Sequence, residues 1–184
     1  MDDSDDALMQ RAGKGDRPAC ETLVARHLGR TTSFAHRMLG SRSDAEDAAQ
    51  EVFLRVWTAA PGWTAGSARF TTWLHRVAMN VCLDRIAKRR ETTGDVPDVA
   101  DVRAEPSATL DALDVARHVQ GALAALPETQ RVAVTLCHYQ GLSNREAAEV
   151  IGVSVDALES LLARGRRALR ERLRLVAPAL LRKD

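Results

Sequence analysis

The stretch SNREAAEVIGVSVDALESLLARGRRALRERLR, residues 143–174, decides the fold of the C-terminal part of this chain. Ser143 is a good N-cap, and Glu146 can reach back to the backbone amide of the cap, so SNRE forms a capping box that begins a helix. Gly152 ends that helix because glycine adopts a left-handed backbone at little steric cost. Ser154 then caps a second helix, so the stretch predicts a helix-turn-helix.

The second of these helices combines an apolar stripe with a basic outer face. Six arginines lie between Arg164 and Arg174, and only Glu171 offsets their charge. A positive helical face attracts the phosphate backbone of nucleic acids. A solvated helix end is the alternative, because basic residues are favoured near helix C-termini. The capped first helix and the glycine turn favour DNA binding. The apolar stripe consists of Val155, Leu158, Leu161, Leu162, Ala168, Leu169 and Leu173.

The composition indicates an all-α protein. Of the 184 residues 45% are hydrophobic and 28% charged, with only three Phe, three Trp and one Tyr. Alternating apolar and polar runs of the strand type are scarce. Charge is segregated along the chain: residues 1–91 carry 14 basic and 12 acidic side chains, residues 92–114 carry 1 and 6, and residues 115–184 carry 11 and 7. We expect two small helical domains, 1–91 and 111–184, joined at 92–110 by a flexible acidic linker that allows variable separation.

The remaining totals exclude several classes of protein. No apolar run approaches the roughly 20 residues that span a bilayer, and the acidic start MDDSDDALM is unlike a secretory signal, so we expect a cytoplasmic protein. Cys20, Cys82 and Cys137 are too far apart for a disulfide framework or a zinc site, so we expect buried free thiols, no metal and no cofactor. No nucleophile elbow, phosphate loop or metal-ligand spacing suggests an enzyme.

In the N-terminal part of the chain, the third helix in chain order is expected to begin at Ser43 or Asp44, within DAEDAAQEVFLRVW, residues 44–57. Its polar face is acidic and carries an amide. Periodicity alone explains such a face as solvated surface. The residues that point outward are Glu46, Asp47, Gln50 and Glu51, and those that form the buried face are Ala45, Ala48, Ala49, Val52, Phe53 and Val56.

A second basic helix is expected in ARFTTWLHRVAMNVCLDRIAKRRE, residues 68–91. Arginine and asparagine suit base edges as well as phosphates, although a basic cluster at a helix C-terminus can also complement the helix dipole. The loop before it, AAPGWTAGSA, exposes Trp63 unless that ring folds back onto a neighbour. The side chains that can share the outer surface of this helix are Arg76, Asn80, Asp84, Arg85, Lys88 and Arg89.

Taken in order, these segments resemble bacterial RNA polymerase sigma factors of the extracytoplasmic function (ECF) group of the sigma-70 family. Residues 44–57 are similar to the polymerase-binding helix of sigma region 2, and residues 70–90 to its promoter-melting and minus-ten helix. Residues 126–169 are similar to region 4. The resemblance covers nearly the whole chain and implies a dissociable initiation factor without catalytic activity.

The resemblance also implies roles for individual residues. Asp47, Gln50 and Glu51 would contact the clamp helices of the polymerase largest subunit, which replaces the solvated-face interpretation. The loop at Trp63 would capture a base flipped from the non-template strand. The other implied minus-ten contacts are Asn80, Asp84, Arg85, Lys88 and Arg89, and the implied minus-thirty-five contacts are Ser143, Asn144, Glu159, Ser160, Ala163, Arg164, Arg166 and Arg167.

The chain departs from the family pattern in region 4. The family commonly has basic residues at the positions of Glu159 and Leu161, so a carboxylate replaces a basic contact and a different promoter preference is expected. Glutamate can accept a hydrogen bond from cytosine N4. The implied partners are core RNA polymerase, promoter DNA and an anti-sigma factor, which in this family is often membrane-borne. A self-sufficient repressor that dimerises on two half-sites is the competing interpretation.

Overall fold

The computed structural model describes residues 3–64, 66, 69–93 and 110–180, and within these residues it contains helices and no strands, which confirms the all-α prediction. The expected linker, residues 92–110, lies almost entirely outside the described residues, and the domain boundaries stay a prediction. The helices are α1 (Asp5–Ala12), α2 (Arg17–Leu39), α3 (Arg42–Ala59), α4 (Phe70–Thr93), α5 (Leu110–Ala124), α6 (Glu128–Val134), α7 (Asn144–Ile151) and α8 (Val155–Leu180), with short 3-10 and π-helical turns at Ala60–Gly62 and Thr135–Tyr139.

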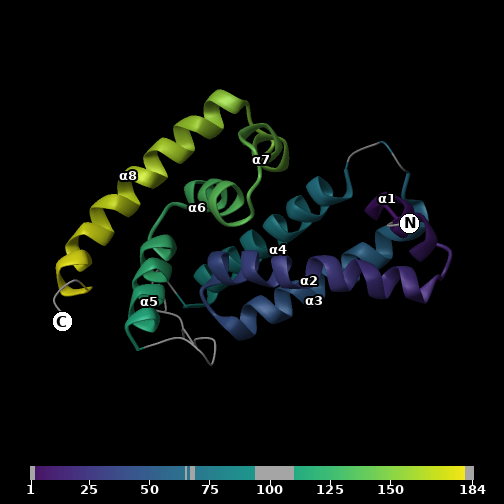
Figure 1. The fold of residues 1–184 in the computed structure, drawn as a ribbon, viewed down its shortest axis with the longest axis horizontal. Helices are drawn as coiled ribbons and strands as arrows, with labels where there is room; N and C mark the ends of the chain where they lie inside the picture. The colour runs from purple at the N-terminus through teal and green to yellow at the C-terminus, as the bar shows by residue number, and fades with distance from the viewer. Residues whose placement is uncertain (1–2, 65, 67–68, 94–109, 181–184) are drawn as a thin grey trace.

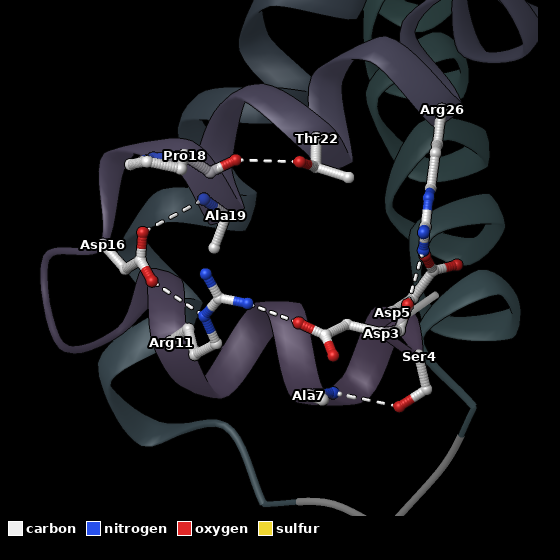
Figure 2. A network of polar contacts seen from close by, with 10 residues as sticks. All are labelled: Asp3, Ser4, Asp5, Ala7, Arg11, Asp16, Pro18, Ala19, Thr22 and Arg26. Carbon is white, nitrogen blue, oxygen red and sulfur yellow. Dashed lines mark hydrogen bonds and ion pairs between the residues drawn. The ribbon is translucent and has the colours of Figure 1, made fainter. Parts of the chain in front are cut away.

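Side-chain caps fix the ends of the first helices (Figure 2). The Ser4 hydroxyl accepts a hydrogen bond from the Ala7 amide at 3.2 Å, and the Asp16 carboxylate accepts one from the Ala19 amide at 3.2 Å. Each bond satisfies an amide that has no intrahelical partner. Arg11 donates to Asp16 at 2.7 Å and so joins α1 to the start of α2.

The third helix begins earlier than the sequence predicted. Ser41 is its N-cap, with the Asp44 amide 3.3 Å from the Ser41 hydroxyl, so the prediction of a start at Ser43 or Asp44 was wrong. Gly40, in the left-handed conformation at φ 79°, ends α2 directly before this cap and leaves no room for a longer loop. The buried face of α3 is as predicted, and its members are at most 6% exposed: Ala45, Ala48, Ala49, Val52, Phe53 and Val56.

The C-terminal helices form the predicted helix-turn-helix. The Ser143 amide donates to the Glu146 carboxylate at 2.9 Å, and the Glu146 amide donates to the Ser143 hydroxyl at 3.3 Å, which completes the capping box. Gly152 has the left-handed conformation at φ 81°. Leu158 lies at 0% exposure on α8, whereas Val155, in the first turn, is 38% exposed, so the predicted buried stripe begins one turn later than expected.

The two groups of helices pack against each other (Figure 1). In the figure α5 to α8, green to yellow, lie along one side of α1 to α4, purple to teal, with α2 against α5 and α4 against α7. We call α1–α4 the N-terminal unit and α5–α8 the C-terminal unit. Sequence periodicity predicted the helices but not this packed arrangement of the units.

Three side chains hold the units together by donating to the last carbonyls of helices. The buried Arg131 guanidinium donates to the Met38 carbonyl at 2.7 Å and to the Leu126 carbonyl at 3.2 Å. Gln120 donates to the carbonyls of the last turn of α2, His36 at 3.1 Å and Arg37 at 3.2 Å. Arg76 donates to the last turn of α7, to the Glu149 carbonyl at 2.5 Å and the Val150 carbonyl at 3.3 Å. The carbonyls of Arg37, Met38, Glu149 and Val150 lie in last turns and lack intrahelical partners, so these bonds satisfy groups that would otherwise need water. The His36 carbonyl also accepts the Gly40 amide at 2.8 Å.

A cavity of about 210 Å³ lies between the units, lined by histidines of α2 and α4 and by residues 140–142 of the C-terminal unit. Within it, burial lowers the pKa of His75, and the charges of Arg30 and His27 act in the same direction. Hydrogen bonds to Thr71 and Gln140 oppose this shift without reversing it. The packed form therefore favours a neutral His75.

Arg131 provides a test of the packing. Replacing it with Met removes donors from buried carbonyls, so we expect the free energy of unfolding to decrease by about 3 kcal/mol. The Arg131→Met variant should also have a larger radius of gyration in small-angle scattering, because a bond between the units is lost. Arg145→Met, on the exposed surface of α7, is the matched control. Unchanged stability and size would contradict the role of Arg131.

His75 predicts a pH dependence of stability. Its folded-state pKa lies below the ordinary value of 6.5, so the unfolded chain binds the proton more readily and stability decreases as pH falls below about 6.5. Burial lowers the pKa of His36 as well, so both groups act in the same direction. Denaturant unfolding between about pH 5.5 and 7.5 should show a weaker pH dependence in His75→Gln, and an unchanged one in the control Gln10→Asn, which replaces an exposed neutral side chain on α1. Equal slopes in all three proteins would refute the assignment.

Candidate nucleic-acid and polymerase interfaces

The outer face of α8 carries most of the predicted minus-thirty-five residues. Arg164 is exposed, and its Nε donates to the Ser160 carbonyl one turn earlier at 3.2 Å, which directs the guanidinium along the helix. The buried Leu158 and Leu162 hold the opposite face against the rest of the C-terminal unit. The structure therefore gathers these predicted residues on one accessible surface: Glu159, Ser160, Ala163, Arg164, Arg166 and Arg167.

The two predicted residues at the start of α7 differ in their surroundings. The Ser143 hydroxyl donates to Glu146 at 2.7 Å and accepts the Glu146 amide, so its hydrogen-bonding capacity serves the cap. Asn144 is half-buried, and its Nδ2 donates to Oε1 of Glu159 at 3.2 Å. The structure thus joins two predicted contact residues that lie 15 positions apart in the chain.

The predicted minus-ten surface of α4 is divided. Asn80, Asp84 and Lys88 are exposed. Arg85 and Arg89 instead point toward α3: Arg85 donates to Glu51 at 3.1 Å, and Arg89 forms an ion pair with Asp44. Helical periodicity gave both arginines an outward position, and the neighbouring acidic helix that attracts them was not visible in the sequence pattern.

The predicted polymerase-binding face of α3 is accessible at Asp47 and Gln50. Glu51 accepts from Arg55 at 2.7 Å and from Arg85 at 3.1 Å. Burial would raise the pKa of Glu51, but the hydrogen bonds from the two arginines outweigh burial and lower it. A residue that faces the polymerase in the prediction is therefore tied to one that faces DNA.

Sequence reasoning missed Leu54, which continues the same face of α3. Its side chain is 65% exposed, the most exposed large hydrophobic residue in the described part of the chain. Helical spacing could have placed Leu54 on this face, because it lies four positions after Gln50 and three after Glu51. Carboxylates beside an exposed leucine suit a protein surface better than DNA, whose phosphates repel them.

Trp63 folds back onto its neighbours instead of extending into solvent. Its indole N–H donates to Asp6 at 3.0 Å, and its ring centroid lies 5.8 Å from that of Phe70 and 5.3 Å from that of Trp73. Both ring pairs are edge-to-face, an arrangement that stabilises aromatic clusters. The half-buried Trp63 thus forms part of a wall at the start of α4, and residues 65, 67 and 68 of the same loop lie outside the described residues.

The packed arrangement also covers part of α4. Arg76, one turn before Asn80, is engaged by the last carbonyls of α7, and Arg69 lies 3.8 Å from Glu146. The first half of α4 and the first helix of the helix-turn-helix are therefore in contact. Both helices, α4 and α7, belong to segments predicted to bind DNA, and here they lie against each other.

The three cysteines differ in burial, and no cluster of metal-ligating side chains is found in the described part of the chain. The histidines, cysteines and carboxylates of the described residues form no group of three able to hold a metal ion, and none of the described helices combines the length and apolar character needed to cross a bilayer. Burial raises the pKa of Cys82 to about 12. Cys20 and Cys137 are only half-buried, so the prediction of buried thiols is correct for Cys82 alone.

Comparisons with known proteins identify two family domains in the chain. The family model for sigma-70 region 2 matches residues 23–92, and that for sigma-70 region 4 matches residues 117–169. The chain is 35% identical over 161 residues to the ECF RNA polymerase sigma factor SigE of Mycolicibacterium smegmatis, covering 85% of this chain and 62% of SigE. The chain thus spans less than two thirds of that relative. It is 35% identical over 170 residues to SigM of Mycobacterium tuberculosis, covering 90% of this chain and 83% of SigM.

Solved structures show the same fold. CnrH, in complex with the cytosolic domain of CnrY, has a TM-score of 0.71 at 30% identity, covering 94% of this chain and 99% of that one. The sigma factor RpoE of Bartonella quintana, in complex with the anti-sigma factor NepR, has a TM-score of 0.71 at 23% identity, covering 84% and 96%. With regions 2 and 4 in order and relatives of this identity and coverage, the chain belongs to the ECF RNA polymerase sigma factors of the sigma-70 family.

Proposed function

We propose that this chain binds core RNA polymerase through α3 and directs it to promoters, with α8 bound to the upstream duplex and α4 to the opened strand. The observation that carries the proposal is the pair of basic helices, one in each unit, within segments that match sigma regions 2 and 4. The chain contributes recognition and no covalent chemistry. It acts in the cytoplasm, where polymerase and chromosome are found.

The duplex contact uses the exposed arginines of α8. A recognition helix lies in the major groove with its N-terminal residues at the base edges. Arg164 is suited to a bidentate contact with guanine, whereas Arg166 and Arg167 neutralise phosphates and set the position of the helix.

The strand contact uses α4 and the aromatic wall at its start. Extruding a base costs a few kcal/mol, which stacking and backbone contacts must offset. Trp63 and Trp73 offer the aromatic surface, and Asn80 and Lys88 offer exposed polar groups further along α4. Arg85 becomes available to DNA when its carboxylate partner Glu51 on α3 is engaged elsewhere.

Polymerase and DNA binding are coupled through Glu51 in this proposal. A polymerase cation that takes up the Glu51 carboxylate replaces Arg85 there, and Arg85 is then free to approach a phosphate. The packed arrangement of the units must also open, because α7 covers the first half of α4. Polymerase binding supplies the free energy for both changes.

An antagonist is proposed as the second protein partner. CnrH, at 30% identity, is found in complex with the cytosolic domain of CnrY. We propose that an anti-sigma factor, which can be membrane-borne, binds this chain and competes with polymerase. The exposed Leu54 and its acidic neighbours on α3 are one surface that both partners could contact.

Reversing charge on α3 tests the polymerase contact. Asp47→Lys combined with Gln50→Lys should weaken binding to core RNA polymerase by about tenfold or more, because both exposed side chains lie on the proposed face. Glu51 is left unchanged, since its loss would also release Arg85. Fluorescence anisotropy with purified core measures the affinity. Glu21→Lys, an exposed carboxylate on α2, is the control, and an unaltered affinity of the double variant would refute the proposed face.

Replacing Arg164 tests the duplex contact. Arg164→Ala should reduce transcription from promoters with an upstream element, because loss of the base contact costs about 1 to 3 kcal/mol of promoter-binding free energy. Binding to core RNA polymerase should stay unchanged. Run-off transcription with and without the upstream element measures the effect. Equal loss on both templates would contradict a base contact. Tight, palindrome-dependent binding to duplex DNA without polymerase would identify a dimeric repressor instead.

A further inference from the structure

Glu159 occupies an unusual place for a carboxylate. It is exposed in the second turn of α8. In a helix-turn-helix, the N-terminal residues of the second helix are the ones that contact base edges. Phosphates on both sides of the groove repel a negative side chain. A carboxylate at this position gains a favourable contact with DNA by accepting a hydrogen bond from a donor on a base.

Asn144 fixes the direction of this carboxylate. The Asn144 Nδ2 donates to Oε1 of Glu159 at 3.2 Å, which links the first residue of α7 to α8. A carboxylate only accepts, so the NH₂ group of the amide must face Glu159. On the other side the Cys137 sulfur lies 3.9 Å from Oδ1 of Asn144, and burial raises the pKa of Cys137, which keeps it a thiol able to donate.

The bond to Asn144 orients Glu159 without neutralising it. Asn144 is uncharged, and among the described residues no arginine, lysine or histidine forms an ion pair with Glu159. This differs from Glu51, which two arginines hold on α3. The second carboxylate oxygen of Glu159 accepts no bond from a described side chain and keeps its capacity for a donor in the groove.

The bases differ in what they offer to such an acceptor. In the major groove cytosine presents the N4 amino donor, whereas guanine and the thymine carbonyl present acceptors that repel a carboxylate. Adenine has the N6 donor, but its N7 acceptor lies beside it. We propose that Glu159, positioned by Asn144, recognises cytosine at one position of the upstream promoter element. This inference rests on the proposed function of α8.

A promoter library tests the assignment. Holoenzyme reconstituted from core RNA polymerase and the full chain transcribes templates with a randomised upstream element, and sequencing of the transcripts gives the base preference at each position. The wild-type chain should prefer cytosine at one position by about tenfold. Glu159→Ala should abolish that preference alone. Glu159→Gln should move it to adenine, because an amide pairs with N6 and N7 together.

Asn144→Ala separates positioning from folding. It should reduce the cytosine preference about threefold, the effect of losing one hydrogen bond, and leave the preferences at other positions unchanged. A general loss of activity at all sequences would overturn the positioning role, because it would show that Asn144 acts in folding or in a direct contact with the DNA backbone instead. Glu171→Gln, an exposed carboxylate later on α8, is the matched control and should keep the wild-type profile.

Two further results would overturn the inference in different ways. If the wild-type chain shows no cytosine preference, or if Glu159→Ala keeps the wild-type preference, base recognition by Glu159 is refuted. Promoter-directed transcription would persist in both cases. Wild-type holoenzyme that shows no preference anywhere in the upstream element would refute the proposed duplex contact of α8 and, with it, this inference.

Discussion

The packed structure depends on the need of helix-terminal carbonyls for donors. The Arg37 and Met38 carbonyls of α2 and the Glu149 carbonyl of α7 have no partner within their own helices, and side chains of the opposite unit supply one. Arg131 is the central case, because its buried guanidinium binds carbonyls of both units and burial lowers its pKa. These bonds replace solvent at helix ends, so the units fit together only where ends and donors coincide.

Electrostatics divides the surface of the chain more finely than its net charge of +1 indicates. The acidic face of α3 lies against the basic side of α4, and the ion pairs Glu51–Arg85 and Asp44–Arg89 cross between them. Groups at roughly one-third exposure are partly screened, so such pairs exchange partners at modest cost. In the proposed function, an arginine on this surface exchanges a carboxylate partner of its own chain for a phosphate of DNA.

The two basic helices, α8 and α4, differ in how far their arginines pair with carboxylates of the same chain. On α8 the described arginines face solvent, and the Glu159 carboxylate is held by a neutral amide. The surface of α8 proposed to bind the upstream duplex is therefore accessible in the packed form, whereas the surface of α4 proposed to bind the opened strand is partly covered by α7 and partly paired with α3. In the proposed function this order matches initiation, since duplex recognition can precede strand capture.

The sequence by itself determined the helices, the capping box of α7 and the helix-turn-helix, because hydrophobic periodicity and capping act within a few residues, although the predicted start of α3 was wrong. It also carried the motifs of regions 2 and 4 and the unusual Glu159. Only the tertiary structure decided that Arg85 and Arg89 turn toward α3, that Trp63 folds onto Phe70 and Trp73, and that Asn144 meets Glu159. Each of these contacts joins separate helices, and the direction of a side chain depends on which helix packs beside it, which one-dimensional periodicity does not encode.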